Sequence, residues 1–398
     1  MKKLALAVAA ASMIAGAAQA GSHMPNEVRL GVALGFTGPA ESLAASMAAG
    51  AELAMKEVSD SGKLLGGAKV TSSRADSTCT DAAAAAAAAE RLIAAEKVDA
   101  IVGALCSGAT ISILQNVAMP NGVVLFSPSA TSPALSTLED NGYFFRASPS
   151  DARQGQVIAE MLKEKGYKSI ALSYTNNDYG KGLADSIQSN FEAAGGKVTI
   201  NTPHEDGKGD YSAEVGALAQ AGGDILVVAG YLDQGGKGII QSSLDSGAFD
   251  HFFLPDAMIG DSLTAAIGKD LNGSIGTVPG TDSPGSATYQ EMAKAAGFEA
   301  GPYSDYSYDA AAMTLLAMQA AKSKDSKVFK DFVFEIANAP GEKIYPGELA
   351  KGLEILANGG QIDYVGATAV ELIGGGESAG SYREILVKDQ KNTTVRYR

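Results

Sequence analysis

VRLGVAL at residues 28–34, followed by GFTGP at 35–39, is the stretch that decides the fold class. The first part is an apolar run of strand length, and the second carries the Gly and Pro residues of a turn. Residues 42–58 come next, and their apolar positions recur at the spacing of a helix. The order then repeats, with strands expected at 69–74, 99–103 and 123–126 and helices at 81–97 and 112–118. Alternating strands and helices predict a parallel sheet with helices on both faces.

A second series of the same kind begins after residues 146–151. Its expected helices are 154–165, 182–193, 212–221 and 236–246, and its expected strands are 169–174, 197–201, 224–229 and 252–254. GTVPGT at 276–281 is interpreted as a second crossing, followed by helices at 308–321 and 327–337 and strands near 365–372 and 382–387. The pattern predicts two doubly wound α/β lobes, 25–146 with 283–380 and 147–282 with 381–398.

The composition is that of an acidic globular protein. The 398 residues are 46% hydrophobic and 19% charged, and the formal net charge is −14. This charge disfavours binding to nucleic acid or to anionic lipid, so we expect no nucleic-acid partner. Two Cys residues are too few for a four-Cys zinc site or a cluster, and we expect no metal ion and no cofactor.

The N-terminus has the pattern of a secretory signal peptide. Lys2 and Lys3 precede an apolar stretch at 4–18, and AQA at 18–20 is typical of a cleavage site. We therefore expect residues 1–20 to be removed on export to the periplasm, with a buried N-terminal helix as the alternative. GSHM at 21–24 is interpreted as a cloning remnant.

The chain has two Cys residues, Cys79 and Cys106. An exported chain meets an oxidising compartment, where a disulfide is the usual state, and the expected helix and strand between the two residues allow their ends to meet. Two buried free thiols are the alternative. A catalytic Cys is disfavoured because His204 and His251, the His residues outside the cloning remnant, lie far away in sequence.

The candidate site lies in the strand-to-helix loops, because open parallel sheets bind ligands beyond the carboxyl ends of their strands. In the first lobe, the loops at 105–110 and 127–133 place Ser and Thr hydroxyls at expected helix starts. Such positions suit an anion such as a carboxylate, and plain helix capping is the alternative.

The loops of the second lobe carry aromatic and acidic residues. Tyr179 and Tyr231 each follow an apolar strand and are candidates to cover the face of a ligand, with surface or packing roles as the alternative. Asp256 is a candidate partner for an ammonium group. In PYSDYSY at 302–308, one of three Tyr residues is expected to face the cleft and the others to pack.

Complete enzyme signatures are missing from the sequence. It contains no H-E-x-x-H or G-x-x-x-x-G-K-[ST] motif, and in GESAG at 376–380, which has the form G-x-S-x-G, no His follows the Ser. We therefore expect a protein without enzymatic activity, and an exported hydrolase or amidase is the weaker alternative.

Several stretches are similar to one known family: GVALGFTGPA at 31–40, GALCSGAT at 103–110, FSPSATSPALS at 126–136, YTNNDYGKGLADS at 174–186 and VVAGYLDQGGKGIIQSS at 227–243. From residue 28 onward, the sequence resembles the periplasmic leucine/isoleucine/valine-binding proteins, the receptors of branched-chain-type amino acid ABC transporters. The resemblance implies a type I periplasmic binding protein, whose two lobes are joined by three crossing strands and close on ligand like a hinge. The disulfide of the family matches Cys79 and Cys106.

The resemblance implies where an amino acid binds on the first lobe. The carboxylate position falls to Ser107, with Ser129, Ala130 and Thr131 from the next loop. Leu105 belongs to the same ligand-binding set. The ammonium group is held in part by Thr131 and by backbone oxygens of this lobe.

On the second lobe, Asp256 occupies the acidic position that pairs with the ammonium group, where a Glu is common in the family. Tyr179 and Tyr231 match aromatic positions that seal the cleft, and Tyr303 matches a further aromatic wall. Leu43 stands where the family often carries an aromatic residue, which implies a side-chain pocket of different size and polarity.

The implied function is that of an extracytoplasmic solute receptor. It binds a small amino acid or a related carboxylate-bearing solute and delivers it to the permease and ATPase subunits of an ABC transporter, and the receptor is expected to be a monomer. The same fold with another solute, such as a small carboxylate, a short amide or a quaternary ammonium compound, is the alternative.

Overall fold

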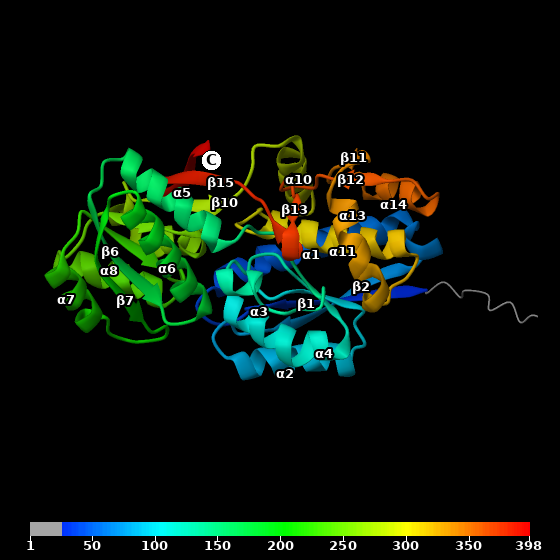
Figure 1. Cartoon of the computed structure of the whole chain (residues 1–398), viewed down its shortest axis with the longest axis horizontal. Coiled ribbons are helices and arrows are strands. Elements are labelled where there is room, and N and C mark those ends of the chain that lie inside the picture. The colour runs from blue at the N-terminus through cyan, green and yellow to red at the C-terminus, as the bar shows by residue number, and fades with distance from the viewer. Residues whose placement is uncertain (1–25) are drawn as a thin grey trace, which may run out of the picture.

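The computed structural model describes residues 26–398. The predicted signal peptide and the segment at 21–24 lie outside the described residues. The described chain forms two α/β lobes side by side, as Figure 1 shows. This architecture confirms the predicted fold class.

The first sheet has five strands, and all neighbouring strands are parallel. In spatial order they are β2 (Lys69–Asp76), β1 (Glu27–Leu34), β3 (Ala100–Gly103), β4 (Val124–Ser127) and β5 (Phe144–Arg146). The helices between them are α1 (Glu41–Ser61), α2 (Ala82–Ala94), α3 (Ser107–Ile113) and α4 (Met119–Asn121). Strands β3 and β4 are wholly buried, as expected for a parallel sheet that is covered on both faces.

The second sheet has seven strands. In spatial order they are β16 (Lys391–Tyr397), β15 (Tyr382–Lys388), β10 (Ile275–Pro279), β9 (Phe252–Leu254), β8 (Ile225–Ala229), β6 (Ser169–Thr175) and β7 (Lys197–His204). Its helices are α5 (Asp151–Glu164), α6 (Asp178–Ala193), α7 (Ser212–Ala221), α8 (Gly235–Ser246) and α9 (Asp261–Ile267). The strands from β6 to β10 are parallel to their neighbours, whereas β15 pairs with β10 and with β16 in the antiparallel direction.

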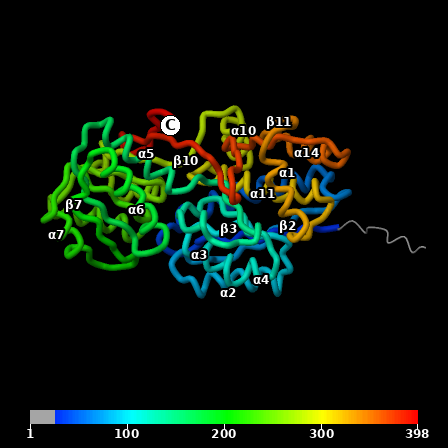
Figure 2. The backbone as a smooth tube through the Cα atoms, viewed as in Figure 1, coloured from blue at the N-terminus to red at the C-terminus, as the bar shows by residue number. Residues whose placement is uncertain are grey.

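The segment between β10 and β15 returns to the first lobe. It contains α10 (Pro284–Ala295), α11 (Ser304–Ala321), α12 (Ser326–Phe329), α13 (Val333–Ala337) and α14 (Leu349–Ala357), and the short strands β11 (Glu342–Ile344), β12 (Ile362–Tyr364), β13 (Leu372–Ile373) and β14 (Glu377–Ser378). Helix α11 packs along α1 and against β3 and β4. The chain therefore passes between the lobes after β5, after β10 and before β15, and Figure 2 lets the reader follow these passages.

Gly50 allows the close approach of α1 and α11. A Cβ atom at this position would lie 2.1 Å from the carbonyl oxygen of Ser304 and 2.8 Å from the hydroxyl of Tyr289. Any larger residue would push the start of α11 away from α1. This contact matters for the site because Tyr303 immediately precedes α11.

The structure corrects several expected elements. Residues 365–371 do not form a strand but a loop between β12 and β13, in which Ala367 and Thr368 donate their N–H groups to the buried Asp309 carboxylate at 2.8 and 2.9 Å. The expected helix at 327–337 is divided into α12 and α13 by a short 3-10 turn. Helices α10 and α14 and strands β5 and β16 were not predicted.

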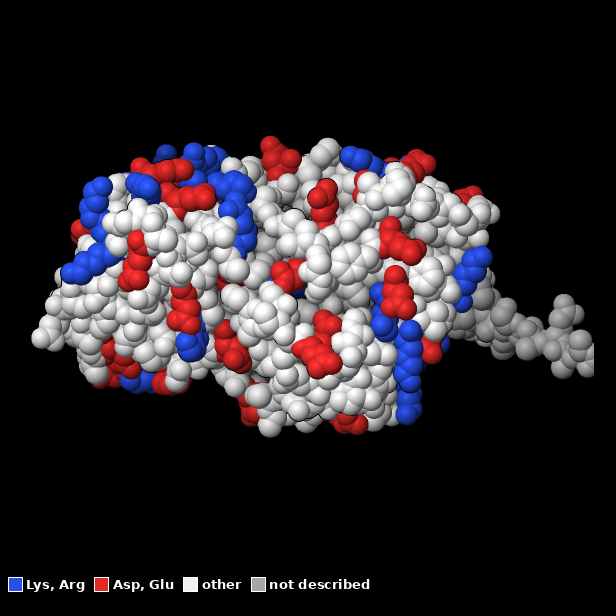
Figure 3. All heavy atoms as spheres, in the orientation of Figure 1, with Lys and Arg blue, Asp and Glu red and all other residues white. Residues whose placement is uncertain are grey.

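The charged side chains of the second lobe form ion pairs around the last strands. Arg396 lies in β16, and Arg398 directly follows the end of this strand. Both side chains form ion pairs with Glu164 of α5 and with the nearly buried Glu384 of β15. Figure 3 shows basic and acidic side chains side by side over this part of the molecule. In residues 26–398, no helix combines the length and the apolar run that a membrane span requires.

Candidate functional site

A small cavity of about 10 Å³ lies between the two lobes. The first lobe lines it from α1, from the loops after β3 and β4, and from the residue before α11, and the second lobe lines it from the loops after β6, β8 and β9. The lining residues are Leu43, Leu105, Cys106, Ser107, Ser129, Tyr179, Tyr231, Asp256, Ala257 and Tyr303. Sites for drug-sized molecules enclose roughly 300–1,000 Å³, whereas this cavity has room for about one water molecule, so a solute would fit only after the lining side chains or the lobes move apart.

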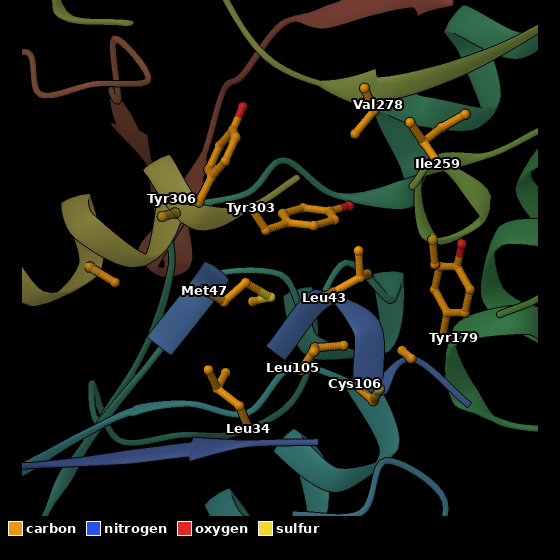
Figure 4. Close-up of a cluster of buried hydrophobic side chains, with 14 of the residues drawn as sticks. Leu34, Leu43, Met47, Leu105, Cys106, Tyr179, Ile259, Val278, Tyr303 and Tyr306 are labelled. Carbon is orange, nitrogen blue, oxygen red and sulfur yellow. The ribbon is translucent and has the colours of Figure 1, made fainter. Parts of the chain in front are cut away.

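The sequence-predicted site residues converge on this cavity. All of them line it except Ala130 and Thr131, which are buried on the same loop as Ser129. Figure 4 shows how Leu43 and Leu105 of the first lobe lie opposite Tyr179 of the second. The loops meet because parallel strands carry all their carboxyl ends to one edge of a sheet. The roles of these residues toward a solute stay predictions.

The Ser hydroxyls of the first lobe differ in what they can offer a solute. The Ser129 hydroxyl donates its proton to the carbonyl oxygen of Leu105 at 2.8 Å. The Ser107 hydroxyl accepts from the N–H of Ser132 at 3.1 Å and keeps its own proton. Since a carboxylate needs donors, Ser107 is the better partner for it.

Arg146, at the end of β5, holds the loop that carries Thr131. Its buried guanidinium donates to the carbonyl oxygens of Ala130 and Ser132 at 3.3 and 2.9 Å, on either side of Thr131. The same group forms an ion pair with Glu377 at 2.9 Å. Arg146 therefore fixes the backbone beside the cavity, and its charge is already paired.

Asp256 is the acidic residue of the cavity wall. The Tyr179 hydroxyl donates to its Oδ1 atom at 2.8 Å, and the Tyr303 hydroxyl donates to its Oδ2 atom. Burial raises the pKa of Asp256 above its ordinary value, and the two Tyr hydroxyls act in the opposite direction. Both oxygens of this carboxylate thus have a neutral donor.

Tyr303 adopts a backbone conformation that is uncommon for a bulky residue. Its φ angle is +63°, in the left-handed region, directly before α11. In Figure 4 its ring extends from the side of α11 toward the second lobe. Such conformations persist where the surrounding packing holds them and are concentrated at binding sites.

Asp151 is a second buried carboxylate that the sequence analysis did not identify. It is the first residue of α5 and is fully buried, and neither of its carboxylate oxygens has a hydrogen-bond partner within residues 26–398. Burial and the nearby charge of Asp256 raise its pKa well above the ordinary value, whereas the Thr131 hydroxyl and the Arg146 charge lower it. The Thr131 hydroxyl is near but outside hydrogen-bonding geometry.

Asp151 was missed because its local sequence points elsewhere. The Ser150 side chain accepts from the N–H of Ala152, so the sequence around it is that of an ordinary helix start. The tertiary contact between the Asp151 N–H and the Thr131 carbonyl oxygen, at 2.8 Å, places this residue beside the Thr131 loop, behind the residues that line the cavity. A buried, unpaired carboxylate is costly unless a cation joins it.

Tyr179 and Tyr231 stack on each other rather than facing a common centre. Their ring centroids are 5.2 Å apart and the rings are inclined by 23°. A cage for a quaternary ammonium group needs several ring faces directed at one point. The stacked pair therefore forms a wall rather than a cage.

The other predicted residues have packing or tethering roles. Tyr306 packs against Tyr303 at a centroid distance of 5.8 Å, and Tyr308 donates to Glu57 away from the cavity. Cys79 and Cys106 form the expected disulfide. It ties the loop after β2 to the residue before Ser107, and thus to the cavity wall.

Comparisons with known proteins agree with this architecture. A family model described as periplasmic binding protein matches residues 27–333. A Leu/Ile/Val-binding protein homolog 1 of Brucella suis is 31% identical over 322 residues, which cover 80% of this chain and 83% of that protein.

Solved structures share the fold at lower identity. A leucine binding protein from Thermotoga maritima has a TM-score of 0.79 at 21% identity, covering 93% of this chain and 98% of that one. A solute binding protein from R. palustris in complex with benzoate has a TM-score of 0.76 at 16% identity, covering 93% and 96%. The chain belongs to the periplasmic binding protein family, in the leucine/isoleucine/valine-binding type, and is a solute receptor rather than an enzyme.

Proposed function

We propose that this protein captures a small zwitterionic amino acid in the interlobe cavity and presents it to the permease of an ABC transporter. The observation that carries the proposal is the distribution of polar groups around one cavity. A hydroxyl that keeps its proton, on Ser107, lines the cavity from the first lobe, and Asp256 lines it from the second, with Asp151 nearby. An α-amino acid carries the complementary carboxylate and ammonium groups.

The ammonium group is assigned to the region between Asp151 and Asp256. Both oxygens of Asp256 already accept from Tyr hydroxyls, whereas those of Asp151 have no partner among the described residues. A cation placed between the two carboxylates would relieve their mutual repulsion and the cost of burial. The proposal therefore adds Asp151 to the acidic residue expected from the sequence.

A carboxylate that lacks an amine fits the site less well. It would satisfy Ser107, but it would leave Asp151 and Asp256 without a cation. The benzoate bound by the R. palustris protein is a solute of this kind. We therefore favour an amino acid for this chain, in keeping with the name of its Brucella relative.

Calorimetry with matched analogues of one amino acid tests the proposal. The panel contains L-leucine, L-isoleucine and L-valine, then 4-methylpentanoate, which is leucine without its amine, and 3-methylbutylamine, which is leucine without its carboxylate. We expect an amino acid to bind and both truncated analogues to fail. Tighter binding of 4-methylpentanoate or benzoate than of every amino acid would contradict the proposal.

The role of Asp256 is tested by the same method. Asp256→Asn should weaken amino acid binding by about 2–5 kcal/mol, because a buried ammonium group loses a charged partner. Glu160→Gln is a suitable control, because Glu160 is an exposed carboxylate on α5. Unchanged affinity in Asp256→Asn would remove this residue from the ammonium site.

We propose a periplasmic location, on the basis of the signal-peptide pattern at 1–20. Cell fractionation of the native host checks it, and a cytoplasmic pool of the mature-length protein would oppose it.

We also propose that the lobes move as the units 25–146 with 283–380 and 147–282 with 381–398. Hydrogen exchange with and without solute should place changed protection at the passages between these units.

A further inference from the structure

A contact between the lobes joins the first turn of α1 to the loop between β8 and α8. The N–H of Ser42 donates to the Oδ2 atom of Asp233 at 2.9 Å, across 191 residues of sequence. The N–H of Asp233 in turn donates to the carbonyl oxygen of Pro39 at 3.0 Å. The Ser262 hydroxyl donates to the Oδ1 atom of Asp233 at 2.6 Å and orients the carboxylate from within the second lobe.

Helix α1 lacks a side-chain cap of its own. Ala40 occupies the N-cap position and makes no capping hydrogen bond. The N–H groups of a first helical turn need acceptors from outside the helix, and an Asp carboxylate is among the best. Its negative charge also interacts favourably with the positive end of the helix dipole. Asp233 therefore serves as the cap of a helix that belongs to the other lobe.

The contact lies at the rim of the solute cavity. Ser42 immediately precedes Leu43, and Asp233 follows Tyr231 by two positions, while Leu43 and Tyr231 both line the cavity. Separation of the lobes at this rim would break the Ser42–Asp233 and Asp233–Pro39 hydrogen bonds together. It would also leave the N–H of Ser42 without its acceptor.

We propose that Asp233 is a positioning residue for solute retention, which stabilises the closed form by capping α1 across the cleft. It contacts no solute and acts through the position of α1 and Leu43. An interaction that exists only in the closed form shifts the population toward that form, and a solute that binds there gains affinity by the same factor. The inference rests on the proposed function, because it takes the cavity as the solute site.

The test compares Asp233→Ala with Asp233→Asn and Asp261→Ala. Asp261 lies in the same lobe, is exposed and makes no side-chain hydrogen bond within residues 26–398, so its replacement removes the same charge without the cap. Stopped-flow binding with L-leucine, or with the amino acid of the panel that binds, gives association and dissociation rates. Dyes on Glu90→Cys and Glu192→Cys, which are exposed on α2 and α6, report the distance between the lobes.

We expect Asp233→Ala to raise the dissociation rate and the Kd by roughly three- to tenfold, the range expected for one lost helix cap. The association rate of Asp233→Ala should change less than twofold. For Asp261→Ala, both rates and the Kd should change less than twofold. Asp233→Asn should recover part of the loss, because its amide oxygen still accepts from Ser42. The closed population should fall in Asp233→Ala, which a merely structural role within one lobe would not produce.

Two results separate the failure of this inference from failure of the proposed function. Wild-type binding and wild-type interlobe distances in Asp233→Ala would overturn the role of Asp233. If no amino acid binds to the wild-type protein, the proposed function fails. The role of Asp233 is then decided by the interlobe distances measured without ligand. A smaller closed population in Asp233→Ala then supports the cap, and an unchanged one overturns it.

Discussion

The Tyr303 hydroxyl of the first lobe donates a hydrogen bond to the Asp256 carboxylate of the second lobe. The other oxygen of Asp256 accepts from Tyr179, which belongs to the same lobe as Asp256. One carboxylate thus receives one donor from each side of the cleft. The two donors are chemically alike, but only one of them connects the lobes.

This difference predicts different effects for two conservative variants. Tyr303→Phe removes a bond between the lobes and should reduce the closed population of the solute-free protein, whereas Tyr179→Phe should not. Both should raise the pKa of Asp256 further, because each removes a hydroxyl that stabilises its charged form. Interlobe distance measurements check the first effect. Equal distance distributions in the two variants would argue against a bridging role for Tyr303.

Asp151→Asn should raise stability and lower affinity. Burial and the charge of Asp256 raise the pKa of Asp151, so ionisation of this group destabilises the native protein as the pH rises through that pKa. Removal of the charge should raise the Tm at pH 7 by about 2–4 °C, which corresponds to about 1 kcal/mol in lobes of this size. Amino acid binding should weaken because the ammonium group loses a partner. Thermal unfolding measures the change in Tm, and calorimetry measures the change in affinity. An unchanged Tm together with an unchanged affinity would contradict the assignment.

Gly50→Ala should destabilise the protein by about 1–3 kcal/mol, because its methyl group meets the Ser304 carbonyl oxygen. Displacement of α11 should also move Tyr303 and weaken solute binding. Gly216→Ala is the matched control, since Gly216 is an exposed residue inside α7 with free space around its Cβ position. It should stabilise the protein by about 0.5–1 kcal/mol. Urea unfolding measures the free energy of unfolding of both variants. Equal changes in this free energy would refute the packing argument.

His204 should make the protein sensitive to mild acid. Burial lowers its pKa to about 4, whereas an unfolded His titrates near 6.5. As the pH falls from about 6.5 to about 4, the unfolded chain therefore gains a proton that the native state does not, and the free energy of unfolding decreases by up to about 3 kcal/mol.

His204→Gln, in which an amide can still contact the Ser173 hydroxyl that bonds Nδ1 at 2.8 Å, should remove this part of the pH dependence. Urea unfolding at pH 7 and pH 4.5 compares the two proteins. Identical losses of stability in both would show that other groups account for the acid sensitivity.

The elements that the sequence predicts best are those with a strong local signal. The helix expected at 212–221 and the strand expected at 252–254 have the observed bounds, because their apolar residues and flanking Gly, Ser and Asp residues mark both ends. The predicted start of α3 at residue 112 was wrong by five positions, since Ser107 and its small neighbours resemble a loop. The loop at 365–371 was mistaken for a strand because Asp309, far away in sequence, fixes its backbone.

The residues of the candidate site also differ in how far the sequence predicts their position. Ser107, Tyr231 and Asp256 follow strands of a parallel sheet, so topology alone brings them to one edge. Asp151 and Asp233 depend on contacts with Thr131 and Ser42 that no local pattern encodes. Their roles become visible only when the partners of each buried or bridging carboxylate are known.

The antiparallel pairing of β15 with β10 has a consequence for the order in which the chain folds. The second sheet begins at β6, but its edge stays open until residues 382–388 have been synthesised and added. The first sheet likewise waits for α11 to cover β3 and β4. Domains usually fold one after another as they leave the ribosome. Here the first sheet needs α11 and the second needs β15, so neither half can complete its core before residues 304–321 have been made.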